Sequence, residues 1–266
     1  MLKQFILTLL CLCTIQNLSA VSKKEIETIG QKIWQNEAKC EEELLVFWNK
    51  NESFPSLGIG HNIWFPEGWL TKNPDVRFTE SFPLLCNYLE KNKVVLPAWL
   101  KKAKNSGAPW KSREDFYKDE QRLQELRTLL VKTTALQAHY MIDRLEEKLP
   151  KIIEKAPISQ RKKISKNITL MRSTFLGTYA LVDYLNFKGD GLNSREATKG
   201  QGWGLLAVLL DMPDNLNKNN VTKAFTVSAA KKLITRIENS APYYAPLVFF
   251  EGWMKRISTY SEEKAC

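Results

Sequence analysis

The stretch "NEAKCEEELLVFWNKNESFPSLGIGH", residues 36–61, joins the end of an apolar helical pattern to a turn rich in glycine. Upstream of it, Ser22 and Glu25 form the S-x-x-E signature of a helix start, and isoleucines recur at positions 26, 29 and 33. We therefore predict a first helix over residues 23–39. Between residues 49 and 66, Gly, Pro, Ser and Asn are interleaved with apolar residues, which is typical of a short β-hairpin or twisted ribbon.

From residue 81 onward, the pattern is helical almost without interruption. Predicted helices span 81–92, 97–104, 112–132, 134–149, 158–172, 173–187, 202–211, 221–239 and 246–260. The predicted fold class is therefore α+β and predominantly α, with one domain over residues 21–266 that consists of helical parts and a small β ribbon. Within it, the charged segment near 112–160 is expected to form a helical arm or long hairpin, with Leu123, Leu126 and Leu130 on one side.

The first twenty residues, "MLKQFILTLLCLCTIQNLSA", have the layout of a secretory signal peptide. A lysine precedes a short apolar run, and the small residue Ala20 stands before the polar "VSKKE". The apolar run is shorter than the roughly 20 residues that span a bilayer. We expect cleavage after Ala20, export to the periplasm or the medium, and no integral membrane association.

Charge and cysteine content narrow the classes of partner. The net charge of +10 favours polyanions, and export favours a cell-wall polymer such as peptidoglycan over nucleic acid, for which no binding motif is present.

The predicted mature chain keeps Cys40, Cys86 and Cys266, so Cys40 and Cys86 either form a disulfide or lie buried as small apolar residues. With two histidines and no CxxC pair, we predict neither a metal site nor a cofactor.

Glu37 extends the apolar stripe of the first helix. Positions 26, 29, 33 and 37 are separated by three, four and four residues, so Glu37 falls on the face that should be buried. A carboxyl against apolar walls has a raised pKa and can keep its proton near neutral pH, as a general acid must. The alternative is that Glu37 lies on a frayed last turn and points into water.

The hexapeptide "SLGIGH" supplies the second part of a possible site. Gly58 and Gly60 allow the backbone to come close to a ligand, and the hydroxyl of Ser56 can hold a water molecule. Glycines in a hairpin also mark simple bulges, which is the alternative interpretation.

Together, the helix ending in Glu37 and the ribbon reaching "SLGIGH" resemble the phage-type lysozymes of the lysozyme-like superfamily, in which a catalytic Glu precedes a hairpin reading T-[IV]-G-[YIW]-G-H. The resemblance covers about residues 25–65. It implies that Glu37 is the acid, that Ser56 replaces the threonine that positions water, and that His61 is structural. The family places an aspartate on the ribbon; here Glu52 is the only acidic residue near that place.

Over nearly its whole predicted mature length, the chain also resembles a group of uncharacterised exported bacterial proteins, through "WQNE", "SLGIGHNIWFP", "YALVDYLNFKGDG" and "KGQGWGLLAVL". In the third block, a buried Asp183 needs a partner, which we expect to be Lys188, Arg172 or His61, in a structural role favoured over a catalytic one. Asp190 lies between two glycines and is expected to be accessible to a ligand, where it could assist Ser56 in place of Glu52.

Aromatic and amide side chains complete the predicted site. Indoles stack on sugar rings and amides bond sugar hydroxyl or N-acetyl groups, although a tryptophan is more often part of a core. The predicted substrate-binding residues are Gly58, Gly60, Trp64, Lys188, Gln201 and Trp203. The sequence thus predicts a glycoside hydrolase that cleaves an N-acetylated amino-sugar polymer, most plausibly peptidoglycan, by hydrolysis or lytic transglycosylation. The alternatives are a non-catalytic exported glycan-binding protein with the same cleft, and a chitinase- or chitosanase-like hydrolase.

Overall fold

The computed structural model describes residues 21–74, 76, 79–194, 197–240 and 247–261; the predicted signal peptide and Cys266 lie outside these ranges. The described chain is mostly helical with two small antiparallel sheets, which confirms the predicted class. None of the helices in these ranges is long and apolar enough to cross a membrane.

The first part of the chain contains a helix, a three-stranded ribbon and a series of short helices. Its elements are α1 (Lys23–Ala38), the 3-10 turn η1 (Glu42–Leu45), β1 (Val46–Phe47), β2 (Ser56–Leu57), β3 (Asn62–Ile63), α2 (Trp69–Lys72), α3 (Phe82–Lys91), α4 (Ala98–Ala103), α5 (Arg113–Lys118) and α6 (Glu120–Lys132). In the ribbon, β2 lies between β1 and β3 and pairs antiparallel with both.

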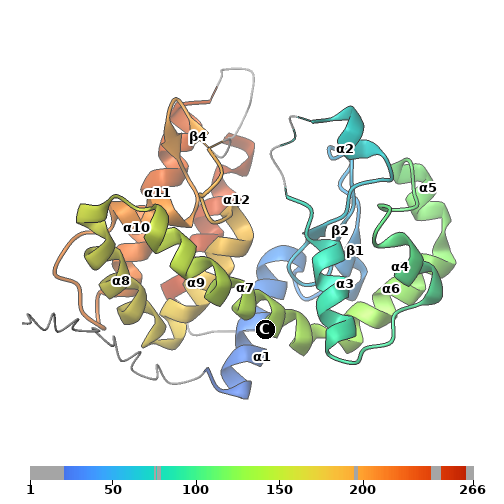
Figure 1. Ribbon diagram of the computed structural model, residues 1–266, viewed down its shortest axis with the longest axis horizontal. Coiled ribbons are helices and arrows are strands. Elements are labelled where there is room, and N and C mark those ends of the chain that lie inside the picture. The colour runs from blue at the N-terminus through green and yellow to red at the C-terminus, as the bar shows by residue number, and fades with distance from the viewer. Residues whose placement is uncertain (1–20, 75, 77–78, 195–196, 241–246, 262–266) are drawn as a thin grey trace, which may run out of the picture.

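The second part is helical except for one hairpin. Its elements are α7 (Thr134–Lys155), α8 (Ile158–Arg172), α9 (Phe175–Lys188), β4 (Ala197–Thr198), β5 (Gln201–Gly202), α10 (Leu205–Asp211), α11 (Val221–Glu238), α12 (Leu247–Ser258) and the 3-10 turn η2 (Thr259–Ser261). Figure 1 shows two groups of elements on either side of α1 and α7. We name them the ribbon lobe, residues 42–132, and the helical lobe, residues 158–261.

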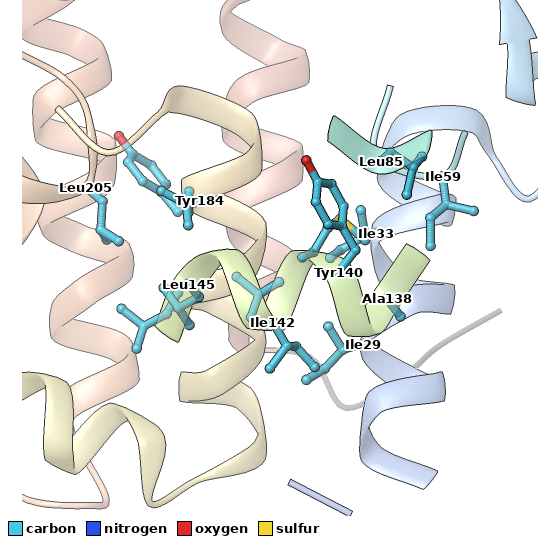
Figure 2. Close-up of a cluster of buried hydrophobic side chains, with 14 of the residues drawn as sticks. Ile29, Ile33, Ile59, Leu85, Ala138, Tyr140, Ile142, Leu145, Tyr184 and Leu205 are labelled. Carbon is cyan, nitrogen blue, oxygen red and sulfur yellow. The ribbon is translucent and has the colours of Figure 1, made fainter. Parts of the chain in front are cut away.

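Helix α1 forms as the sequence predicts. The Ser22 hydroxyl accepts a hydrogen bond from the Glu25 amide while the Glu25 carboxylate accepts one from the Ser22 amide, so the capping box is complete. The isoleucine stripe is buried, with Ile29 and Ile33 fully enclosed. In Figure 2, these two side chains face those of α7, among them Ala138 and Ile142. The apolar face therefore fixes α1 against the helix that lies between the two lobes.

The segment near 112–160 does not project as an arm. Leu123, Leu126 and Leu130 of α6 are buried in the core, and α7 packs against α1, α3, α8 and α9. The predicted helix 112–132 is divided at Asp119, whose carboxylate caps α6 by accepting a hydrogen bond from the Arg122 amide at 3.3 Å. Helix α7 continues through Pro150 to Lys155, because packing of its buried face outweighs the single backbone hydrogen bond that proline removes.

Candidate functional site

Glu37 lies in the last turn of α1, where residues from both lobes meet. Its Oε1 accepts hydrogen bonds from Arg256 Nη1 of α12 at 2.8 Å and from Asn186 Nδ2 of α9 at 3.2 Å. Its Oε2 is 3.5 Å from His61 Nδ1 in the turn between β2 and β3. The side chain keeps 15 % of its surface exposed. Glu37 is therefore a largely enclosed carboxyl that still has contact with solvent, and its partners come from three segments far apart in the sequence.

The surroundings of Glu37 favour its ionised form, contrary to the prediction. Burial by itself would raise the pKa of the Glu37 carboxyl, as the apolar stripe suggested. The positive charge of Arg256 and its hydrogen bond, with smaller effects of His61 and Lys188, outweigh burial and hold this pKa below its usual value. The expectation of a carboxyl that keeps its proton near neutral pH is therefore wrong, because the walls of the site are cationic as well as apolar.

Arg256 connects Glu37 to a second, fully buried carboxylate. Its Nε and Nη2 donate to the two oxygens of Asp183 at 2.9 and 2.8 Å, and the Tyr260 hydroxyl donates to Asp183 Oδ2 at 2.7 Å. Asp183 is completely enclosed and Arg256 is 7 % exposed. The predicted structural role of Asp183 agrees with these contacts, but its partner is Arg256 and not Lys188, Arg172 or His61. The Asp183–Arg256 pair in turn orients the guanidinium toward Glu37.

The two glycines of "SLGIGH" bring the backbone close to protein side chains, contrary to the expected approach to a ligand. Gly58 has φ +76°, and a Cβ at this position would lie 2.4 Å from Gln137 Oε1, the atom that accepts the Ile59 amide at 2.9 Å. A Cβ on Gly60 would meet the Asn186 side chain, whose Nδ2 donates to the Gly60 carbonyl at 3.0 Å. The glycines thus seat the turn against α7 and α9 and place His61 beside Glu37.

His61 lies between the ribbon and the end of α1. It adopts φ +46°, its Nε2 is 3.3 Å from the Leu44 carbonyl, and its ring stacks on Phe47 at 6.5 Å between centroids. Together with Nδ1 near Glu37, these contacts hold the ring between the ribbon and the end of α1.

The other predicted catalytic residues do not join Glu37. Among the described residues, none of Ser56, Glu52 and Asp190 lies within hydrogen-bond or ion-pair distance of its carboxyl. Ser56 is buried in the central strand β2, and Glu52 is exposed in the loop between β1 and β2. Asp190 pairs with Lys148 at 2.8 Å and accepts the Leu192 amide at 2.9 Å, so its carboxylate is held by partners other than the Glu37 site.

The predicted sugar platforms are mostly part of the core. Trp64 is fully buried among Phe82, Trp99 and Trp110, which excludes it as a surface for sugar stacking. Trp203 is 6 % exposed and its indole stacks on Arg236 at 4.1 Å. Gln201 is exposed in strand β5 of the hairpin that precedes Trp203.

Lys188, at the end of α9, is a predicted binding residue whose charge acts on the Glu37 carboxyl. Its Nζ is 3.8 Å from the centroid of the Phe187 ring and 3.7 Å from that of Trp253. Burial, together with the charges of Arg236 and Arg256, lowers the pKa of Lys188 well below its usual value, while Glu37 acts in the opposite direction.

Cys40 and Cys86 do not form the predicted disulfide. Cys86 is a free, fully buried thiol in α3, and burial raises its pKa to about 12. It is thus the small buried residue of the alternative interpretation. Cys40 is disulfide-bonded, and its partner is not Cys86.

Arg256 and Asn186 are the site residues that the sequence did not single out. Arg256 follows the apolar residues of "LVFFEGWM", and an arginine within an amphipathic helix face is a weak sign of a buried partner. A buried Asp183 needs a cationic partner, but the spacing of residues along the sequence does not show which distant residue supplies it.

Comparison of the chain with protein-family models, curated proteins and solved structures finds no match.

Proposed function

We propose that this protein cleaves an N-acetylated amino-sugar polymer, most plausibly peptidoglycan, with Glu37 as general acid. One observation carries the proposal: a largely enclosed but accessible carboxyl lies between two lobes, with hydrogen-bond donors on one oxygen and a histidine at the other. Export and a net charge of +10 agree with a negatively charged wall polymer as partner.

The proposed reaction begins with proton transfer from Glu37 to the glycosidic oxygen as that bond breaks. Since no second carboxyl among the described residues pairs with Glu37, we favour the lytic transglycosylase variant. In it, the sugar's own hydroxyl attacks the developing positive charge and gives its proton to the Glu37 carboxylate, which restores the acid. Arg256 stabilises the carboxylate that forms after proton transfer. Asn186 holds the same oxygen, and Asp183 fixes the guanidinium in place.

The charged walls also determine the pH at which the acid can act. A general acid must be protonated in the free enzyme, and the pKa of Glu37 lies below its usual value. We therefore expect kcat/KM to increase as the pH falls toward the pKa of Glu37, and to decrease as the pH rises above it. The site is suited to an acidic optimum.

Wall degradation by matched variants tests the proposal. Purified peptidoglycan sacculi are incubated with the wild type, with Glu37→Gln and with Glu42→Gln, which changes an exposed glutamate on the neighbouring η1 turn. The proposal requires rapid loss of turbidity with the wild type and Glu42→Gln and at least a hundredfold slower loss with Glu37→Gln. Equal loss with all three proteins would refute catalysis by Glu37.

A non-catalytic glycan-binding protein is the second candidate function. It is favoured by the ion pair with Arg256, which keeps Glu37 ionised and leaves no proton to donate at neutral pH. Sacculus binding without turbidity loss at any pH between about 3 and 8, equal for wild type and Glu37→Gln, would support this function. A chitinase-like activity is separated from both by offering soluble chitooligosaccharides and muropeptides side by side.

A further inference from the structure

A cluster of cations and aromatic rings lies beside Glu37 in the helical lobe. It consists of Phe187, Lys188, Trp203, Arg236 and Trp253, and we name it the cation–aromatic cluster. Its side chains come from α9, the segment after β5, α11 and α12. Arg256, which pairs with Glu37, also stacks on Phe187 at 4.2 Å, so the cluster adjoins the site directly.

The ammonium group of Lys188 is the notable group of this cluster. It lies between the faces of Phe187 and Trp253, 3.8 and 3.7 Å from their centroids. Within the ranges that the structure describes, its Nζ makes neither a hydrogen bond nor an ion pair with a carboxylate. A cation enclosed in this way keeps its charge at a free-energy cost unless an anion compensates it.

The surrounding charges strengthen the demand for an anion. Arg236 lies over Trp203 at 4.1 Å and over Trp253 at 5.1 Å, and Arg256 is the other guanidinium close to Lys188. In the part of the chain that the structure describes, Asp183 is bound by Arg256 and Tyr260, and Glu37 is held by Arg256. Burial is the main cause of the lowered pKa of Lys188, and the charges of Arg236 and Arg256 act in the same direction.

We infer that the cation–aromatic cluster binds the carboxylate of an acidic sugar unit, with Lys188 as its ionic partner. Arginine and lysine form charge-assisted bonds with carboxylates, so an acidic sugar would supply the anion that Lys188 lacks. This inference rests on the proposed function for the position of the sugar chain across Glu37. It adds that the protein distinguishes acidic from neutral glycans, and that Lys188 makes the distinction.

Binding measurements test this inference separately from cleavage. In a Glu37→Gln background, which removes the proposed acid, isothermal titration calorimetry compares two ligands. One is an alternating N-acetylglucosamine–N-acetylmuramic acid tetrasaccharide, and the other is the same compound with its carboxylates converted to methyl esters. We expect the free acid to bind at least about tenfold more tightly than the ester, as a charge-assisted contact implies.

Variants of Lys188 assign the preference to the cluster. Lys188→Gln should abolish the preference for the acid, Lys188→Arg should retain it, and Lys166→Gln, an equal charge change at an exposed position of α8, should leave it unchanged. The retained preference of Lys188→Arg also shows that this part of the protein is folded. Equal affinity for acid and ester before any change of Lys188, or an unchanged preference in Lys188→Gln, would overturn the inference.

The outcome does not depend on that of the proposed function. If the wild type degrades sacculi but binds acid and ester equally, the inference fails and the cleavage proposal stands. If the acid is preferred through Lys188 but no polymer is cleaved, the cleavage proposal fails and the anion site stands.

Discussion

Replacing Arg256 by methionine tests the buried charge network that supports Glu37. The substitution keeps the side-chain volume and removes the guanidinium, which leaves Asp183 completely enclosed with Tyr260 and Asn36 as its remaining donors. Removing one partner of a buried ion pair typically costs about 3–5 kcal/mol. At about 2–4 °C per kcal/mol for a domain of this size, the unfolding midpoint should fall by about 6–20 °C.

Two further variants make this prediction specific. Arg172→Met removes an arginine whose partner, Glu146, is 42 % exposed, and should cost less than about 1 kcal/mol. Asp183→Asn combined with Arg256→Met removes the uncompensated charge and should recover part of the loss, which a double-mutant cycle measures. Free energies of unfolding from urea titrations at pH 7 give the comparison. Similar losses for Arg256→Met and Arg172→Met would refute the argument that Arg256 neutralises a buried carboxylate.

Three other predictions follow from the contacts of the site and the core. Because the folded-state pKa of Glu37 is lowered, its charged form stabilises the fold at pH values above the unfolded-state pKa. The difference in unfolding free energy between wild type and Glu37→Gln should therefore shrink as the pH falls through the folded-state pKa. A constant difference between pH 7 and pH 3 would contradict the shift. Gly58→Ala should lower the free energy of unfolding by about 2–4 kcal/mol in urea titrations, because the new Cβ clashes with Gln137 and the backbone φ is unfavourable for alanine. Gly200→Ala has a similar φ but open space around it, and should lower the free energy of unfolding by only about 1 kcal/mol. Cys86 should react with a thiol reagent only at the rate of unfolding, and rapid labelling of the native protein would show that α3 is not packed as described.

Local patterns in the sequence predicted most of the helices and the ribbon. The capping box at Ser22 and the isoleucine stripe placed α1 within one residue, since both are set by contacts near in the chain. The break at Asp119 and the passage of α7 through Pro150 were missed, because tertiary packing decides whether a helix tolerates a local disruption.

The site was predicted in part, and the physical reason lies in long-range charge pairing. The periodicity that put Glu37 on the buried face was correct, but it could not show that Arg256, more than 200 positions later, lies against the same carboxyl. For the same reason, the sequence could not show that Asp190 pairs with Lys148. Nor could it show that Trp64 is buried, because its burial depends on packing against α3 and α4.

The ionisation of Glu37 tests the account most directly. In protein labelled with 13C at glutamate carboxyl carbons, an NMR titration compared with that of Glu37→Gln identifies the Glu37 signal and gives its pKa. The account predicts a value below the ordinary glutamate pKa of about 4.3, rising when Arg256 is replaced by methionine. A value at or above that of an ordinary glutamate, unchanged in Arg256→Met, would contradict the cationic site described for this carboxyl.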